Sequence, residues 1–296
     1  MLSDRTQLHI ALQKSGRLSD SSRELLRDAG FRIESGKNSL TARVENFPAE
    51  LMFVRDDDIP TFVSDGVCEF GIVGQNVLEE FASDLPEPAY EIVAELGFGR
   101  CSLKIAAPES TAYNGPEALA GQRIATSYPR LVSRFLRERG IEATIVTMNG
   151  AVELAPRLRI ASFICDLVST GATLEANGLK AFETVLESQA VLVRTRKPMD
   201  PVRAEIASGL ISRIDGVLAT KESKYIMLNA AEETLERITA ILPGAEAPTI
   251  VPLHGRPGHF AVHAVCQESV FWETLQKLKG AGASAILVVP IEKMMM

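Results

Sequence analysis

The residues best suited to bind a ligand lie in one short segment that ends an apolar run. Asp166 is followed by residues 169–173, which contain three hydroxyl side chains and Gly171. A glycine-containing loop can turn backbone N–H groups toward one point, and a helix beginning there adds the positive end of its dipole. The segment is typical of a phosphate-binding loop, and the neighbouring carboxylate suits ribose hydroxyls or a metal ion. A tight strand-to-helix turn without a ligand is the alternative.

Two further polar loops follow predicted strands in the N-terminal half. The loop after the strand at 8–12 contains Gln13, Lys14, Gly16 and Arg17. The loop after the strand at 51–54 begins with Arg55 and continues with three aspartates. Ligands of open α/β sheets bind at the carboxyl ends of strands, so the three loops together predict a functional cleft. The alternatives are salt-bridged surface positions for the cations and a capped helix start for the aspartates.

The composition of the chain narrows the class of protein. Its 296 residues indicate two or three domains, and 46% hydrophobic with 23% charged residues is typical of a globular protein. The net charge of −7 argues against a nucleic-acid or anionic-membrane partner. The four cysteines are far apart and form no CxxC pair, so neither a zinc site nor a redox motif is indicated. No apolar run reaches about 18 residues, which predicts a cytoplasmic protein.

The arrangement of apolar runs predicts an α/β fold. Strands and helices alternate over the first two-thirds of the chain, which indicates mainly parallel sheets in two lobes with a cleft between them. The predicted strands are 8–12, 51–54, 70–73, 103–107, 123–126, 143–147, 164–169 and 190–194. Helices are expected from about residue 19 to Gly30, from Pro129 to Gly140, and over 151–158.

The last 75 or so residues have a different pattern, which reads as βαββαβ. Strands are expected at 224–229, 249–253, 260–265 and 285–290, with helices over 235–242 and 271–278. This order predicts a ferredoxin-like domain. It contains no evident catalytic residue, so a ligand sensor, a dimerisation unit and a structural cap remain open.

With these motifs in view, the chain resembles the long form of ATP phosphoribosyltransferase, the first enzyme of histidine biosynthesis. The resemblance covers essentially all of the chain, and its most specific stretches are 11–18, 54–60, 124–129, 165–179 and 285–294. The chain departs from the family pattern at Arg159, where glycine is usual, and at Ser162 and Glu69, where aspartate is expected.

The resemblance implies a fold and domain limits. It implies two α/β lobes like those of periplasmic binding proteins, followed by the ferredoxin-like regulatory domain. Lobe I is expected to hold residues 1–95 and 190–220, lobe II residues 96–189, and the regulatory domain residues 221–296.

It also implies a reaction. Adenine N1 of ATP is joined to C1 of 5-phosphoribosyl 1-pyrophosphate, with Mg²⁺ as cofactor and pyrophosphate as the second product. Adenine N1 carries a lone pair and no proton, so no general base is needed, which fits a chain whose four histidines show no catalytic or metal-ligand spacing. Those histidines are read as structural or surface residues. The protein ligands of the metal stay unassigned.

The resemblance assigns residues to this reaction. Asp166, Glu153 and Lys14 are expected to be catalytic, with Asp166 holding ribose hydroxyls. The 5-phosphate is expected to bind the loop formed by Ser169, Thr170, Gly171, Ala172 and Thr173. The remaining residues expected to bind substrate are Gln13, Gly16, Arg17 and Arg55.

Regulation and assembly are implied as well. Histidine is expected to inhibit the enzyme by binding between regulatory domains of a homo-oligomer, a dimer that converts to a hexamer, with backbone near Thr249 and Ala285 in its pocket. Two other functions remain open from the sequence. One is a cytosolic solute-binding or effector-sensing module. The other is a catalytically inactive regulatory homologue, which the departures from the family pattern at Arg159 and Ser162 support.

Overall fold

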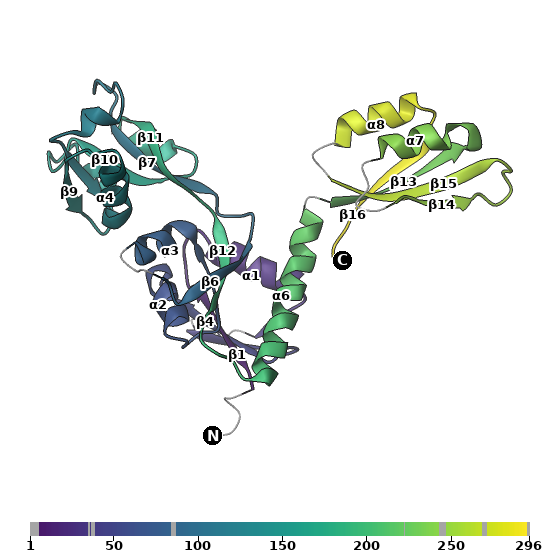
Figure 1. Ribbon diagram of the computed structural model, residues 1–296, viewed down its shortest axis with the longest axis horizontal. Helices are drawn as coiled ribbons and strands as arrows, with labels where there is room; N and C mark the ends of the chain where they lie inside the picture. The colour runs from purple at the N-terminus through teal and green to yellow at the C-terminus, as the bar shows by residue number, and fades with distance from the viewer. Residues whose placement is uncertain are drawn as a thin grey trace. The chain divides into compact units, whose positions relative to one another are not determined.

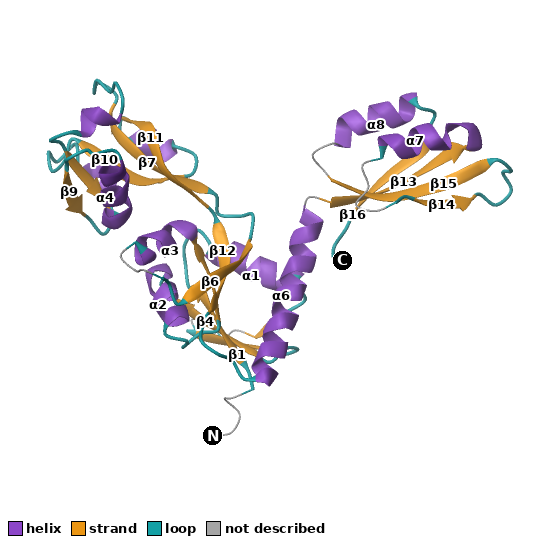
Figure 2. Cartoon of the chain, viewed as in Figure 1, coloured by secondary structure: helices purple, strands orange, loops and turns teal. Residues whose placement is uncertain are grey.

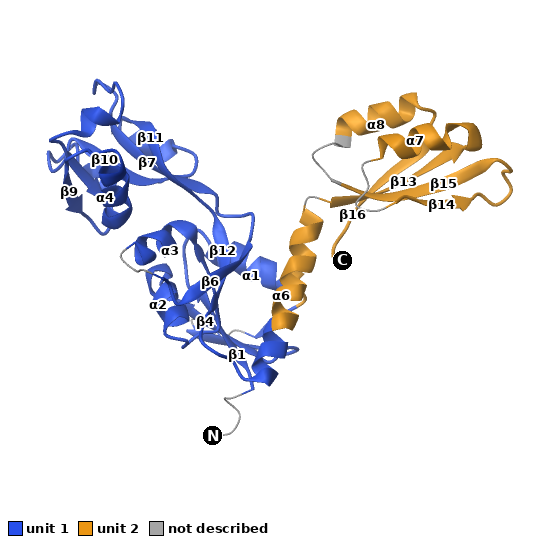
Figure 3. Cartoon of the chain, in the orientation of Figure 1, with its two compact units in different colours: residues 1–27, 31–207 blue, residues 28–30, 208–296 orange. Residues whose placement is uncertain are grey.

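The computed structural model describes residues 6–34, 36, 39–83, 87–221, 223–242, 247–267 and 271–294. The chain forms two compact units, coloured separately in Figure 3. Unit 1 comprises residues 1–27 and 31–207, and unit 2 comprises residues 28–30 and 208–296. Among the described residues, no helix has the length and hydrophobicity needed to cross a membrane.

Unit 1 contains two α/β lobes, and lobe I is built on a mixed sheet with the strand order β2-β3-β4-β1-β5-β12-β6 (Figure 1). Its strands are β1 (Leu8–Gln13), β2 (Ile33–Glu34), β3 (Thr41–Val44), β4 (Ala49–Val54), β5 (Phe70–Gly74), β6 (Tyr90–Glu95) and β12 (Ala190–Thr195). Strand β1 pairs in parallel with β4 and β5. The loops that follow these three strands therefore leave the sheet at the same edge. The other pairings of this sheet are antiparallel, whereas the sequence predicted mainly parallel sheets.

The helices of lobe I are α1 (Ser19–Asp28), α2 (Ile59–Ser64), α3 (Gln75–Ala82) and the 3-10 turn η1 (Asp56–Asp58). Ile59 and Val63 of α2 and Val77 of α3 pack with Val73 and Val193 of the sheet, so α2 and α3 cover one sheet face (Figure 2). Helix α1 ends as predicted, because Gly30 adopts a left-handed conformation and Phe31 N–H bonds to Leu26 O.

Lobe II is built on a sheet with the strand order β11-β7-β10-β8-β9. Its elements are β7 (Cys101–Pro108), η2 (Pro116–Leu119), β8 (Arg123–Thr126), α4 (Pro129–Glu138), β9 (Thr144–Thr147), η3 (Val152–Leu154), β10 (Phe163–Val168), α5 (Ala172–Ala176) and β11 (Leu179–Ser188). Helix α4 packs on one face through Leu131, Val132 and Phe135. The other face packs against Val152 of η3 and Leu174 of α5.

Unit 2 contains a sheet with the strand order β14-β15-β13-β16, in which every pairing is antiparallel. Its elements after the long helix are β13 (Ser223–Ala231), η4 (Glu232–Thr234), α7 (Leu235–Ile241), β14 (Thr249–Pro252), β15 (His259–Gln267), α8 (Phe271–Gly280) and β16 (Ser284–Pro290). This order is that of a ferredoxin-like domain. The predicted fold class, a two-lobed core like periplasmic binding proteins followed by a ferredoxin-like domain, is confirmed.

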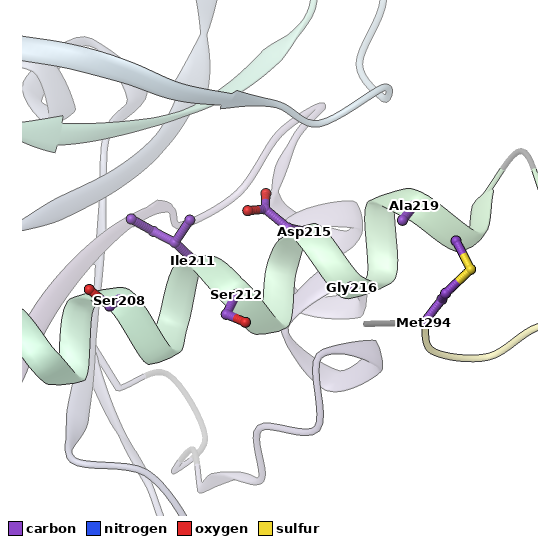
Figure 4. A pocket seen from close by; sticks show the side chains of 7 residues that line it. All are labelled: Ser208, Ile211, Ser212, Asp215, Gly216, Ala219 and Met294. Carbon is purple, nitrogen blue, oxygen red and sulfur yellow. The ribbon is translucent and has the colours of Figure 1, made fainter. Parts of the chain in front are cut away.

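A long helix, α6 (Pro201–Lys221), begins in unit 1 and continues into unit 2. Within unit 2, the C-terminal tail packs on it, because Met294 N–H bonds to Gly216 O at 3.3 Å. A Cβ at position 216 would lie 3.1 Å from Met294 O, which explains the glycine there. A groove of about 410 Å³ runs along this part of the helix, and Figure 4 shows the side chains that line it. It is lined by Ser208, Ile211, Ser212, Asp215, Gly216, Ala219 and Met294.

Two elements differ from the sequence prediction. The helix expected over 151–158 is only the turn η3 followed by irregular turns. Ala151 and Arg159, at the two ends of this segment, both have left-handed backbone conformations. A helix cannot continue through either residue, so the helical hydrogen bonding is confined to the few residues between them. Helix α6 was not predicted, because its apolar residues are spread around the helix instead of following one face.

Candidate functional site

The loop after β10 is an exposed turn that leads into the short helix α5. Gly171 is left-handed (φ 86°) and is the N-cap of α5, and Glu175 N–H bonds back to Gly171 O at 3.1 Å. Ser169, Thr170 and Thr173 are exposed around it. The first N–H groups of a helix have no carbonyl partner within that helix. The hydroxyls and these N–H groups therefore lie in one exposed turn, although α5 is only five residues long.

Asp166 lies on β10, three residues before this loop, on the sheet face that packs with η3 and α5. Strand alternation puts it on the same face as Ile164 and Val168, which belong to that apolar cluster. Burial raises the pKa of the Asp166 carboxyl, a hydrogen bond of 2.8 Å from Leu167 N–H opposes the rise, and the charge of Glu153 adds to it. The structure therefore brings Asp166 and Glu153 within electrostatic reach of each other beside the loop.

The lobe I loop at 13–17 is held partly by its own side chains. The buried Gln13 amide accepts a hydrogen bond from Leu18 N–H at 2.9 Å. Gly16 is left-handed, and a Cβ there would lie 2.7 Å from Gln13 Nε2, so glycine is required. Arg17 donates to the carbonyl of Gly99. Lys14 is exposed. Gln13 and Gly16 thus shape the loop, whereas Lys14 is presented to solvent.

The acidic run after β4 begins a helical segment. Arg55 is exposed at the start of η1, and the three aspartates form the turn that leads into α2. Asp58 is the N-cap residue of α2 but makes no capping hydrogen bond with its side chain. Burial and the neighbouring Asp56 raise the pKa of Asp57, and Arg55 opposes that rise. The aspartates therefore do lie at the start of a helix, α2, but the side chain of Asp58 does not cap it as the alternative reading of this run expected.

Tyr128, to which the sequence assigned no role, connects the two sets of carboxylates. Burial raises the pKa of its hydroxyl, and the charges of Asp166 in lobe II and of Asp56 and Asp57 in lobe I raise it further. Asn76 Nδ2 donates a hydrogen bond to this hydroxyl at 2.9 Å and opposes the rise. The Tyr128 hydroxyl therefore lies within electrostatic reach of carboxylates from both lobes. A tyrosine before Pro129 was the only signal in the sequence.

The four histidines do not form a reactive group in the described part of the chain. His9 lies between Glu50 and Glu69, and His263 bonds to the Tyr225 hydroxyl at 3.1 Å. His254 and His259 are exposed. Across the described residues, no group of three or more His, Cys, Asp or Glu side chains is arranged to hold a metal ion.

The two residues predicted for the inhibitor pocket lie far apart within one chain. Thr249 is on β14 and Ala285 is on β16, and these strands form opposite edges of the unit 2 sheet. Ala285 is left-handed (φ 49°) at an irregularity in the pairing of β13 with β16. Both residues are exposed. A pocket that includes both can form only between copies of the domain.

Two of the family departures have a structural account. Arg159 is left-handed (φ 56°), its N–H bonds to Pro156 O at 3.1 Å, and Ile160 N–H bonds to Ala155 O at 3.0 Å. This is a Schellman motif, in which glycine usually occupies the left-handed position. Glu69, in place of the expected aspartate, is buried and pairs with Arg203. Nothing in the structure explains Ser162.

Comparison with known proteins identifies the family. The family model described as ATP phosphoribosyltransferase matches residues 55–216. The model described as the HisG C-terminal domain matches residues 220–293. An ATP phosphoribosyltransferase from Maricaulis maris is 52% identical over 291 residues, which cover 98% of this chain and 99% of that protein.

A solved structure of a phosphoribosyl transferase complex agrees at the level of the fold. The chain is similar to the ATP phosphoribosyl transferase (HisG:HisZ) complex from Thermotoga maritima, with a TM-score of 0.59 and 24% identity over 72% of this chain and 98% of that one. The alkanesulfonate-binding protein SsuA from Xanthomonas axonopodis pv. citri matches with a TM-score of 0.46 and 16% identity over 72% and 74% of the two chains. With both family models matched in order along one chain, this protein belongs to the ATP phosphoribosyltransferase family, in its long form with the C-terminal domain.

Proposed function

We propose that this protein joins ATP, through adenine N1, to C1 of 5-phosphoribosyl 1-pyrophosphate, giving 1-(5-phosphoribosyl)-ATP and pyrophosphate. This is the first step of histidine biosynthesis, to which the family belongs. The observation that carries the assignment of the site is Asp166 on β10, followed directly by an exposed hydroxyl-rich turn with left-handed Gly171. A phosphorylated ribose offers the two groups that this pair of features suits, a phosphate and vicinal hydroxyls.

In this proposal, each part of the site binds a different part of the substrates. The 5-phosphate binds the turn at 169–173, through backbone N–H groups and the hydroxyls of Thr170 and Thr173. Asp166 accepts hydrogen bonds from the ribose hydroxyls. Lys14 and Arg55, both exposed in lobe I, face the phosphates of either substrate.

The chemistry needs positioning and charge, with no general base. The lone pair of adenine N1 forms the new bond to C1, the bond from C1 to the pyrophosphate oxygen breaks, and pyrophosphate leaves with that electron pair. C1 becomes positively charged during the transfer. Burial makes the ionised form of Asp166 costly in the free protein. A positive centre beside it would relieve that cost most in the transition state, which is differential stabilisation.

The donor set fits a magnesium ion that arrives with the substrate. Mg²⁺ is commonly held by one or two carboxylates together with substrate phosphates. Asp166, and Glu153 whose charge acts on it, would supply such carboxylates, whereas the described residues contain no cluster of three or more candidate ligands. When bound, the ion would neutralise charge on the departing pyrophosphate. Asp166 would at the same time keep the ribose oriented toward the adenine.

We extend the proposal to regulation. Histidine binds between regulatory domains of neighbouring copies, near Thr249 of one copy and Ala285 of another, and shifts a dimer toward a less active hexamer. The support is the placement of these residues on opposite edges of one sheet. Histidine must bind the less active assembly more tightly, since equal affinity would shift nothing. A cytoplasmic location belongs to the same proposal.

The test is release of pyrophosphate from ATP and 5-phosphoribosyl 1-pyrophosphate with Mg²⁺, with and without histidine. We expect release that depends on both substrates and falls when histidine is added. Binding of either compound without release would favour the solute-binding or inactive-homologue readings. Pyrophosphate release that histidine does not reduce would support the proposed transfer reaction but refute the proposed inhibition by histidine.

A further inference from the structure

One face of α3 in lobe I is bonded to lobe II. Asn76, Glu79 and Glu80 have the i, i+3, i+4 spacing that places side chains on one side of a helix. Glu79 Oε2 lies 2.9 Å from Arg134 Nη2 on α4. Asn76 and Glu80 also reach lobe II, through the contacts described next. Three side chains of one short helix therefore act on the other lobe.

Glu80 caps the N-terminus of α4 from the other lobe. Its Oε1 accepts a hydrogen bond from Arg130 N–H and its Oε2 accepts one from Leu131 N–H, each at 2.9 Å. The N-cap residue of α4, Tyr128, supplies no side-chain cap, and Pro129 has no N–H to satisfy. A carboxylate at the positive end of a helix is favourable in itself. The first turn of α4 is therefore completed by a residue of lobe I.

Asn76 connects α3 to Ser188, at the end of β11, and to Tyr128, directly before α4. Its side chain is 1% exposed, and its Oδ1 accepts a hydrogen bond from Ser188 Oγ at 2.9 Å. Its Nδ2 donates to the hydroxyl of Tyr128, the residue directly before α4 of lobe II. A change in the angle between the lobes would break buried hydrogen bonds, which are costly to leave unpaired.

The two chain connections between the lobes do not fix the angle between them, so non-covalent contacts set that angle. The chain crosses between the lobes at 96–100 and again at Gln189. The first crossing contains Gly97 and Gly99, both left-handed. Such short crossings permit hinge motion, so the contacts of α3 with lobe II are well placed to select one angle.

We propose that Asn76, Glu79 and Glu80 form a latch that fixes the angle between the lobes, with Glu80 and Asn76 as positioning residues for the transfer reaction. The latch rests on the proposed function, since it aligns Lys14 and Arg55 of lobe I with the loop at 169–173 of lobe II. Without the latch, substrates must bind to the fraction of molecules at the productive angle. Their apparent affinity then falls by that fraction, whereas turnover of the saturated enzyme is retained.

The experiment compares Glu80→Ala and Glu80→Gln with Glu91→Gln in the full-length chain. Glu91 is half-exposed, as Glu80 is, and it pairs with Arg194 inside lobe I, so Glu91→Gln removes a carboxylate charge of lobe I without changing the contacts between the lobes. Spin labels on cysteines introduced at the exposed positions Thr41 and Glu142 report the distance between the lobes. The doubly labelled chain is diluted with unlabelled chain so that each measured pair belongs to one molecule. The four native cysteines are buried.

We expect Glu80→Ala to broaden the interlobe distance distribution and to raise KM for both substrates by the same factor, about tenfold, with kcat within about twofold of the parent. Glu80→Gln keeps one acceptor oxygen, so its effects should be smaller. Glu91→Gln should match the parent. If Glu80→Ala fails to fold, the interlobe distances and KM values of Glu80→Gln decide whether the latch exists.

Distances and KM values of the Glu80 variants that equal those of Glu91→Gln would overturn the latch. A changed distance with unchanged KM values would overturn the positioning role. A parent chain without transfer activity would refute the proposed function instead, and the distance measurement would still decide whether the latch exists.

Discussion

Arg203, in the first turn of α6, forms an ion pair with Glu69, the residue that precedes β5. The Glu69 side chain is only 4% exposed. Burial acts to raise its pKa, but hydrogen bonds from His9 and the charges of Arg203 and His9 outweigh burial and lower it. The ionised carboxylate is therefore the form that the fold stabilises, and it ties the beginning of α6 to the sheet of lobe I.

Glu69→Gln should lower the free energy of unfolding at neutral pH by about 3 kcal/mol, because it leaves Arg203 in a largely buried place without its counter-charge. A lowered folded pKa stabilises the protein above the unfolded value of 4.5, and this contribution is lost as the pH falls through the folded pKa. The difference between parent and variant should thus be constant near neutrality and shrink below pH 4.5. Urea unfolding at several pH values measures it.

Glu87→Gln is the control for this experiment. Glu87 pairs with Arg196, but the two side chains are 77% and 44% exposed. Exposed pairs contribute about 1 kcal/mol or less. An equal loss of stability in both variants would contradict a special role for the buried pair.

Asp166→Asn should stabilise the free protein and impair the transfer. The folded pKa of Asp166 lies above its ordinary value of 3.8, so the parent loses stability as the pH rises from there through the folded pKa. Asparagine cannot ionise, so the variant should have the higher melting temperature at neutral pH. Loss of a hydrogen bond to a charged group should lower kcat by about tenfold or more, with less effect on binding. A lower melting temperature with unchanged kcat would identify Asp166 as a structural residue only.

Thr170→Ala with Thr173→Ala should weaken binding of 5-phosphoribosyl 1-pyrophosphate. Each hydroxyl bond to a charged phosphate is worth about 1.5–3 kcal/mol, so kcat/KM should fall at least about tenfold. The matched control is Thr144→Ala with Thr147→Ala, two exposed threonines of β9 in the same lobe. Isothermal titration and steady-state kinetics report the effect. Parent-like values in the folded loop variant would remove the phosphate assignment.

Arg159→Gly should stabilise lobe II by about 1 kcal/mol, because the left-handed conformation costs a residue with a Cβ roughly that much. The same motif ends α4, where Gly140 is left-handed and Ile141 N–H bonds to Leu136 O. Gly140→Ala should therefore destabilise the protein by a similar amount. Thermal unfolding of both variants tests the pair, and a destabilised Arg159→Gly would show that the Arg159 side chain contributes more than its backbone costs.

Thr249→Glu and Ala285→Glu should each abolish inhibition by histidine, and a mixture of the two variants should regain part of it. The reason is geometric, since the residues lie on opposite sheet edges, and the proposed pocket combines Thr249 of one copy with Ala285 of another. Mixed oligomers contain some interfaces with native residues on both sides. Inhibition is measured on variants that are unfolded together and refolded, with each variant refolded alone as control. A mixture as insensitive as its components would place the pocket elsewhere.

Local features of the fold were readable from the sequence because each depends on neighbouring residues. Helices α1 and α4 end next to Gly30 and Gly140, because glycine adopts the left-handed backbone conformation at little cost. The loop at 169–173 begins a helix at Gly171 as expected. Helix α6 was missed because further apolar residues, such as the exposed Val202, lie outside the buried face of Leu210, Ile214 and Val217, so the sequence shows no single-face period.

By itself, the sequence determined the α/β class, the ferredoxin-like tail, the family and the loops at strand ends, since these depend on short-range periodicity and on matched motifs. Tertiary structure alone decided that Asn76 donates to the Tyr128 hydroxyl, that Glu80 completes the first turn of α4, and that Glu69 reaches Arg203. Those partners are separated by long stretches of chain. Their meeting depends on how whole elements pack, and no local pattern of residue types encodes that packing.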